Sequence, residues 1–194
     1  MKIIVIVFSI ILVIITATQL FAYKSQKDIE TYPYTVKKKY NGFEIRNYKA
    51  ALFTSIKLSK NDYKETSSKG FSILAGYIFG KNDRNEKIAM TSPVSMSLED
   101  STTMMFMVPS KFEKEDLPKP NQSSIQFKNE PEKTVAAIRF SGWANDEKIE
   151  KYKQELIALL EKEGISYSKR FYFLGYNAPY ELFNRRNEII VELD

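Results

Sequence analysis

The chain has 194 residues, of which 43% are hydrophobic and 13% aromatic, and this composition is sufficient for the core of one ordinary globular domain. Its 29 Lys and Arg residues alternate with 24 Asp and Glu residues instead of forming a basic stripe, which argues against a nucleic-acid-binding surface. Because the sequence has no cysteine and no histidine, it excludes disulfides, Cys-His and Ser-His dyads, and metal sites built from thiolate or imidazole ligands.

The amino terminus has the pattern of an export leader. A lysine at position 2 is followed by an almost unbroken apolar run over residues 3–15, and the small residue Ala22 closes a signal peptide over residues 1–22. Residues 3–22 also approach the about 20 residues that cross a bilayer, so an uncleaved signal anchor is the alternative. Both interpretations predict an exported chain that is periplasmic, secreted or membrane-anchored through residues 3–22. Residues 23–31 are polar and predict a flexible spacer before a domain over residues 32–194.

The first half of this domain alternates strand and helix patterns. Residues 40–46 predict a turn leading into a strand, and residues 50–58 predict a second strand or its continuation. Residues 61–79 predict a helix that ends at Gly80. Residues 87–98 and 102–108 predict two more strands, and the second is apolar on both faces, which predicts a central position in the sheet.

The second half repeats this order. It predicts a strand over residues 135–140, a helix that begins after the N-cap Asn145 and stops before Gly164, and strands over residues 170–175 and 188–193. Each half therefore has the order strand, helix, strand, strand. Such a duplication predicts an α+β fold, in which two β-α-β-β repeats close into one distorted, pseudo-symmetric β-barrel with two helices packed outside. A ligand is then expected in a groove between the halves.

Eight short segments carry a family resemblance when they are taken together and in order. They are residues 43–48, 70–82, 87–94, 106–109, 118–120, 140–142, 176–179 and 186–191. Through these segments the chain resembles the SOUL/haem-binding-protein family over nearly all of residues 33–193. The resemblance implies a distorted barrel, similar to the effector-binding barrels of transcription regulators, and binding of haem or another tetrapyrrole in a surface groove.

The resemblance also implies that basic residues meet the propionates of the porphyrin, and Arg46, Lys87 and Arg186 are the candidates. The alternative for Arg46 beside Glu44, and for Arg186 beside Glu188, is a surface or structural ion pair.

Three apolar residues, Phe71, Met90 and Trp143, are candidate walls of the groove or, alternatively, packing residues. A chain without histidine and cysteine can offer iron only Met, Tyr or Lys, so haem affinity is expected to rest on apolar burial.

These observations predict a non-catalytic, monomeric binding protein for haem, a related tetrapyrrole or another hydrophobic small molecule, with no resident metal site. Two alternatives stay open. Related effector-binding barrels include hydrolases that use a glutamate with aromatic partners, so Glu181 or Glu188 near Tyr176 and Tyr180 could serve a carboxylate-dependent hydrolase of small hydrophobic substrates. The chain could also be an envelope interaction module without a small ligand.

Overall fold

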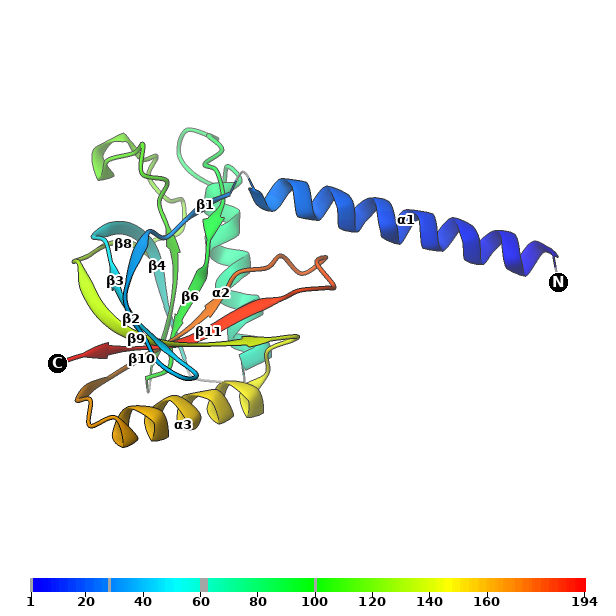
Figure 1. Ribbon diagram of the computed structural model, residues 1–194. Coiled ribbons are helices and arrows are strands. Elements are labelled where there is room, and N and C mark those ends of the chain that lie inside the picture. The colour runs from blue at the N-terminus through cyan, green and yellow to red at the C-terminus, as the bar shows by residue number, and fades with distance from the viewer. Residues whose placement is uncertain (1, 28, 60–62, 100) are drawn as a thin grey trace.

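The computed structural model describes residues 2–27, 29–59, 63–99 and 101–194. A long helix, α1 (Lys2–Lys27), projects from a body in which a strongly curled sheet is covered by two helices (Figure 1). Residues 2–19 of α1 are long and apolar enough to cross a membrane, with a mean hydropathy of 2.4, and none of this segment is buried. The helix continues to Lys27, so residues 23–27 of the expected polar spacer are helical.

The body contains two α-helices, one 3-10 helix and eleven strands among the described residues. The helices are α2 (Tyr63–Ile78), η1 (Lys114–Asp116) and α3 (Asp146–Lys162). The strands of the first half are β1 (Glu30–Thr31), β2 (Tyr34–Lys39), β3 (Glu44–Tyr48), β4 (Ala51–Leu58), β5 (Thr91–Ser92), β6 (Val94–Ser97) and β7 (Thr102–Met107). Those of the second half are β8 (Ile125–Glu130), β9 (Lys133–Ser141), β10 (Tyr167–Gly175) and β11 (Arg186–Leu193).

Nine of these strands form one sheet in the order β2-β3-β9-β11-β10-β6-β7-β4-β8. The order is symmetric about the β10/β6 pair, because β9-β11-β10 in one half matches β4-β7-β6 in the other. Each half therefore contains the predicted β-α-β-β repeat, and the α+β fold class is confirmed. Each repeat also begins with one extra strand that pairs with the other half, since β3 pairs with β9 and β8 pairs with β4.

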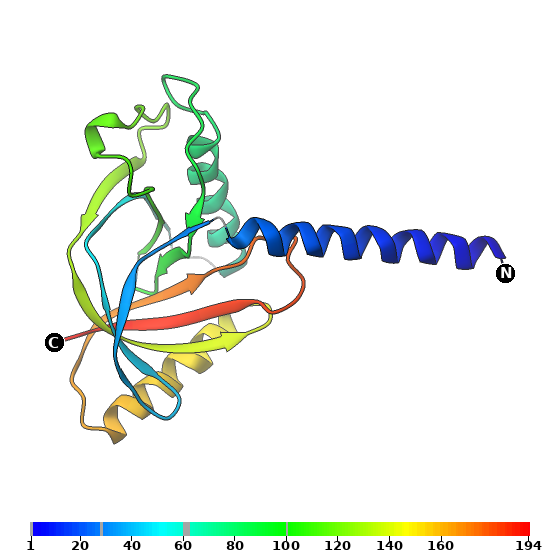
Figure 2. The same ribbon diagram turned by 45° about the horizontal axis from the view of Figure 1, so that its top comes forward.

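These exchanged strands require the sheet to curl. Strands β3 and β4 lie six positions apart in the sheet, which is about 29 Å if the sheet were flat. Only residues 49 and 50 connect them, and such a connection spans at most about 11 Å. The same constraint applies to β8 and β9, which residues 131 and 132 connect. The two turns therefore draw the ends of the sheet together, and the curl is visible in Figures 1 and 2.

The outer face of the curled sheet packs against α2 and α3. Leu74 of α2 and Leu156 and Leu160 of α3 are fully buried there. Helix α3 begins at Asn145, whose side chain accepts a hydrogen bond of 2.9 Å from the Lys148 amide, an N-cap worth about 1 kcal/mol. At Gly70 a Cβ atom would lie 2.7 Å from Leu58, so glycine is what allows α2 to approach the sheet this closely.

The concave face has a separate core made of large side chains. Tyr48 from β3, Phe53 from β4 and Leu174 from β10 are almost completely buried there. Tyr32, which follows β1, lies between them with its ring centroid 4.6 Å from that of Tyr48 and 5.1 Å from that of Phe53. We call these four residues the aromatic plug, although Leu174 is aliphatic, because their rings and methyl groups fill the middle of the concave face.

Several local predictions are confirmed, one is wrong and one strand was missed. The described part of α2, all of α3 with its Asn145 cap, and the central position of β7 between β6 and β4 match the expectations. The expected strand over residues 87–98 consists instead of the short β5 and β6, separated by Pro93, which has no N–H to donate. Strand β8 was not predicted. The expected turn at residues 99–101 includes residue 100, which lies outside the described residues.

Candidate functional site

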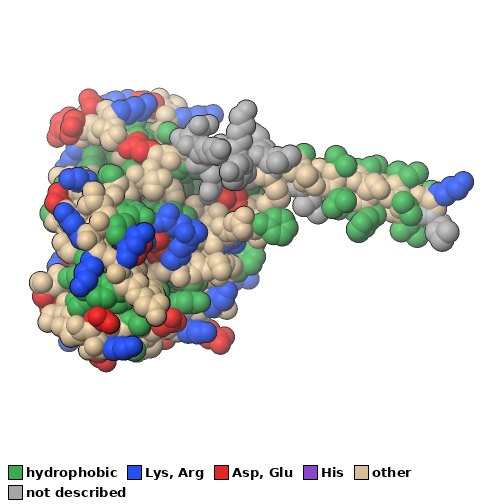
Figure 3. Space-filling model, in the orientation of Figure 1, with side chains coloured by type: hydrophobic (Ala, Val, Ile, Leu, Met, Phe, Trp, Pro, Cys, Tyr) green, Lys and Arg blue, Asp and Glu red, His purple; other side chains and the backbone are tan. Residues whose placement is uncertain are grey.

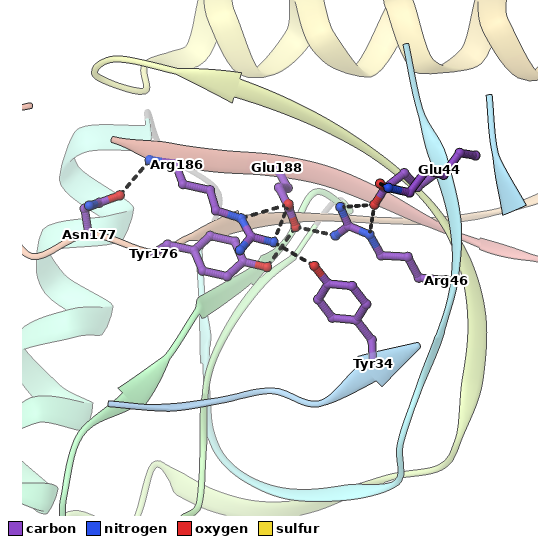
Figure 4. A network of polar contacts seen from close by, with 8 residues as sticks. Tyr34, Glu44, Arg46, Tyr176, Asn177, Arg186 and Glu188 are labelled. Atoms are coloured by element: carbon purple, nitrogen blue, oxygen red, sulfur yellow. Dashed lines mark hydrogen bonds and ion pairs between the residues drawn. The ribbon is translucent and has the colours of Figure 1, made fainter. Parts of the chain in front are cut away.

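A buried carboxylate organises one end of the concave face. Glu188 of β11 is fully buried and accepts four hydrogen bonds (Figure 4). Its Oε2 atom accepts from Arg46 of β3 and from the Tyr176 hydroxyl, each at 2.8 Å. Its Oε1 atom accepts from Nε and Nη2 of Arg186 at 3.0 and 2.7 Å. Two guanidinium groups from strands far apart in the sequence thus share one carboxylate.

These contacts fix the protonation states of the cluster. Burial alone would raise the pKa of Glu188, but the hydrogen bonds and charges of Arg46 and Arg186, with the Tyr176 hydrogen bond, outweigh it and lower the pKa. Burial and the neighbouring anionic groups raise the pKa of Tyr176 far above its usual range. Glu188 is therefore an anion and Tyr176 a neutral hydroxyl donor at physiological pH.

Aromatic rings complete the shell around the two arginines. The Arg46 guanidinium lies 4.4 Å from the ring centroid of Tyr34, and that of Arg186 lies 3.9 Å from the ring centroid of Tyr176. Arg186 also donates to the Tyr34 hydroxyl at 3.1 Å, and Arg46 donates to Glu44 at 2.9 Å. Both ion pairs that the sequence offered as the structural alternative are present, and Arg46 joins them through Glu188.

Two adjoining hollows open beside this cluster, with volumes of about 380 Å³ and about 230 Å³. Both are lined by Arg139 and Arg186, and we call them together the cationic groove. Their charged lining comprises four cations and two carboxylates, and their aromatic lining four rings. The charged residues are Lys39, Arg46, Arg139, Arg186, Glu44 and Glu188, and the rings are Tyr34, Tyr40, Phe43 and Tyr176.

Arg139 is one of two exposed cations that line this groove, and the other, Lys39, lies 3.8 Å from Glu44. Arg139 lies on β9, opposite Glu188 in the strand register. Within the described residues it has no hydrogen-bond or ion-pair partner. An exposed guanidinium without an internal partner is available to an external anion, and carboxylate is a geometric match for it.

The other end of the concave face holds a larger hollow of about 770 Å³, which we call the anionic basin. Along β11 the side chains at 186, 188, 190 and 192 share one face, so Glu192 lies at the opposite end from Arg186. The charged residues that line the basin are Lys128, Lys133, Arg170, Glu99, Glu130, Glu132, Glu192 and Asp194, with carboxylates in excess.

Ion pairs connect each of the three cations that line the basin to its carboxylates. Lys133 lies 2.6 Å from Glu130 and 3.2 Å from Glu192, and Arg170 lies 2.6 Å from Glu192. The aromatic plug lies between this basin and the cationic groove, because Tyr48 packs on Tyr32 and adjoins Arg46 and Glu188, whereas Tyr32 lies near Glu130 and Glu192. The concave face therefore offers two surface hollows of opposite charge.

The six residues predicted from the sequence do not form one site. Arg46 and Arg186 meet at Glu188 and line the cationic groove. Phe71 packs on Phe106 at the outer face, with ring centroids 5.4 Å apart. Lys87 is exposed in the segment after α2, and Met90 packs against the outer core. Trp143 is exposed and lies under the guanidinium of Arg185, 4.0 Å from its ring centroid.

Sequence reasoning missed Arg139 and Tyr34 in the groove. A signal for Arg139 was present, because it shares one face of β9 with the small apolar residues Val135 and Ala137 and interrupts their pattern. No comparable signal marks Tyr34, which reaches the groove through the pairing of β2 with β3.

The two glutamates considered for hydrolysis are both held by internal hydrogen bonds. Glu188 has its four donors, and Glu181 accepts from the side chain of Asn177 and the amide of Ala178, each at 2.7 Å. A general base or nucleophile must reach the substrate. Glu188 is fully buried, and Glu181 is buried with a donor on each carboxylate oxygen, so both are held as structural anions.

Comparison with solved structures defines the class of fold. The C-terminal domain of EcmrR superposes with a TM-score of 0.62 at 11% identity, covering 83% of this chain and 98% of that one. A hydrolase from Listeria innocua superposes with a TM-score of 0.57 at 10% identity, covering 82% and 94%. These similarities show that the chain shares the fold of those domains, an α+β fold with a curled antiparallel sheet.

The sequence comparisons define the family. The model of the family described as SOUL heme-binding protein matches residues 29–192, and the chain therefore belongs to this family. Heme-binding protein 2 of Mus musculus is 30% identical over 182 residues, which cover 89% of this chain and 85% of that protein. Heme-binding protein 2 of Homo sapiens is 32% identical over 156 residues, 76% of each chain. Heme-binding protein 1 of Xenopus laevis is 28% identical, covering 76% and 81%.

Proposed function

We propose that this protein binds a flat, anionic tetrapyrrole such as haem in the cationic groove, as a non-catalytic, monomeric carrier. The observation that carries the proposal is the unpaired Arg139 beside Arg186 in a groove lined by four aromatic rings. Rings suit the faces or edges of a porphyrin, and guanidinium groups suit its propionates. Binding at the surface is also what the filled centre of the concave face leaves possible.

The chemistry of the lining supports binding of the macrocycle more than ligation of iron. Among the residues that line the groove, the oxygen donors most suited to iron are the phenols Tyr34, Tyr40 and Tyr176. Burial keeps Tyr176 protonated, whereas iron is ligated by the phenolate. The ring contacts and the propionate contacts are then expected to supply most of the affinity.

The amino-terminal segment supports a location outside the cytoplasm. Residues 2–19 form an apolar helical segment that does not pack against the body, so its surface would be exposed to water in a soluble protein. The length of the segment suits a bilayer. We therefore propose that residues 3–22 export the domain and, where uncleaved, anchor it in a membrane.

The test is a titration of matched arginine variants with haemin and with iron-free protoporphyrin. Quenching of Trp143, the sole tryptophan, reports binding to the full chain in detergent micelles. Arg139→Gln should weaken both ligands about tenfold, which corresponds to about 1.4 kcal/mol. Arg170→Gln, which removes an exposed arginine from the anionic basin, should leave both affinities unchanged. Because both variants are measured in the same detergent, partitioning of porphyrin into the micelles affects both apparent affinities equally.

Two results would contradict the proposal. Equal porphyrin affinities for Arg139→Gln and Arg170→Gln would show that the cationic groove is not the binding site. A loss of about a hundredfold on removing the iron, or about 2.7 kcal/mol, would show that an axial ligand dominates.

An interaction module without a small ligand is the second candidate function. The aromatic plug favours it, because the protein's own side chains fill the place where a barrel groove is deepest. Failure of both porphyrins to bind in the titration would favour this candidate.

A further inference from the structure

The loop of residues 177–185, between β10 and β11, exposes large apolar side chains to solvent and buries a carboxylate, which is the reverse of an ordinary surface loop. Tyr180, Leu182 and Phe183 are 55%, 47% and 67% exposed, whereas Glu181 between them is 7% exposed. Surface loops normally turn their charges to water, and adjacent exposed apolar side chains mark an interaction surface.

Internal hydrogen bonds hold the loop in this shape. The buried Glu181 carboxylate accepts from Asn177 and from the Ala178 amide. Arg185 donates to the backbone carbonyls of Ala178 and Glu181 at 3.0 and 2.6 Å. These bonds fix the backbone of the loop, so the outward direction of its apolar side chains follows from the loop conformation.

The loop lies at the base of the apolar helix. Gln19, the last residue of the membrane-length segment of α1, donates to the Tyr180 carbonyl at 3.0 Å and accepts from the Leu182 amide at 3.1 Å. Hydrophobic side chains run along the projecting helix and continue onto the body at its base (Figure 3). The exposed apolar residues of the loop therefore adjoin the end of the segment that suits a bilayer.

We propose that the 177–185 loop inserts Tyr180, Leu182 and Phe183 into the headgroup region of the bilayer in which α1 is anchored. This inference rests on the membrane anchoring proposed above for α1. Aromatic residues favour the membrane interface, and an apolar face there is buried by about 5–10 Å. Trp143, packed under Arg185 of the same loop, extends this aromatic surface.

Continuity with the helix selects lipid as the occupant. A bilayer that surrounds residues 2–19 ends where Gln19 meets the loop, so the loop lies at the depth of the headgroups without any movement of the body. A protein partner would require a second surface to meet the same place beside the membrane.

The experiment uses the absence of native cysteine. Phe183→Cys and Lys162→Cys are each labelled with one environment-sensitive fluorophore on the full chain, reconstituted in phosphatidylcholine vesicles that contain a headgroup-proximal nitroxide lipid. Lys162 is the control because it ends α3, whose end points away from α1 (Figures 1 and 2). Both positions carry exposed side chains, so the labels do not disturb packing.

We expect severalfold stronger nitroxide quenching at position 183 than at position 162, with a blue shift of emission at 183. Flotation of the vesicles separates the two hypotheses. Protein that fails to float with the vesicles would overturn anchoring by α1 together with docking of the loop. Protein that floats but shows equal quenching at the two positions would overturn docking alone.

Discussion

The two ends of the concave face each combine carboxylates with cations, but they bury them to different depths. At the cationic groove, the side chains of Glu188 and Arg46 are 0% and 5% exposed. In the anionic basin, Lys133 is 11% exposed, but Arg170 is 62% and Lys128 is 50% exposed, although their partners Glu192 and Glu130 are nearly buried. The buried pair of Arg46 and Glu188 contributes to the stability of the fold, whereas Lys128 and Arg170 remain hydrated. This difference also explains why Arg139, and not Arg46, is the better candidate to meet a ligand.

Loss of the carboxylate charge should have its largest effect at the buried end. Glu188→Gln leaves Arg46 and Arg186 without their shared anion, and breaking a buried pair in this way costs about 3–5 kcal/mol of unfolding free energy. Urea unfolding of the full chain in detergent, followed by Trp143 fluorescence, measures this loss.

Glu192→Gln is the matched variant in the basin. Its partner Arg170 is mostly exposed and can be rehydrated, so the expected loss is about 1 kcal/mol or somewhat more where Lys133 is left half-paired. Equal losses for the two variants would show that burial does not distinguish the two ends.

Low pH should destabilise the native chain more than the Glu188→Gln variant, because only the native chain carries the Glu188 carboxylate. The pKa of Glu188 is lowered in the folded state from an unfolded value near 4.5, so its contribution to stability is fully present above that pH. The contribution is lost as the pH falls through the lowered folded-state pKa. We expect the unfolding free energy of the native chain to fall more steeply below about pH 4.5 than that of Glu188→Gln, which has no proton to gain there. Parallel curves for the two proteins would contradict the lowered pKa.

Local patterns predicted most of the elements because their signals lie within a few residues. Helix α3 shows an amphipathic stripe, an Asn145 cap and a Gly164 stop, all readable along the chain. The exchange of β3 and β8 between halves was not predictable in this way. Their partners are chosen by the curl of the whole sheet, and β8 carries only two buried residues, Ile125 and Glu130, in six.

The candidate site was predictable only where its partners are close in sequence. The pairing of Arg186 with Glu188 follows from their spacing of two on one strand, which places both on the same face. The bond from Arg46 to Glu188 joins residues 142 positions apart and depends on β3 pairing with β9. Phe71, Met90 and Trp143 were selected for their chemistry, and chemistry alone does not indicate which face of the sheet a residue reaches.

The smallest expected effect concerns the aromatic plug that separates the two ends. The Tyr32 hydroxyl is buried and has no hydrogen-bond partner among the described residues, whereas the Tyr34 hydroxyl accepts from Arg186. Removing an unsatisfied buried hydroxyl without changing the ring is neutral or stabilising, so Tyr32→Phe should change the unfolding free energy by between zero and about 1 kcal/mol in the stabilising direction. Tyr34→Phe, the control at the groove, should lose about 0.5–1.5 kcal/mol because it removes an acceptor from a guanidinium. Urea unfolding of both variants beside the native chain gives the comparison. A loss of unfolding free energy for Tyr32→Phe as large as that for Tyr34→Phe would show that the Tyr32 hydroxyl is hydrogen-bonded in solution. Water would then reach the middle of the concave face.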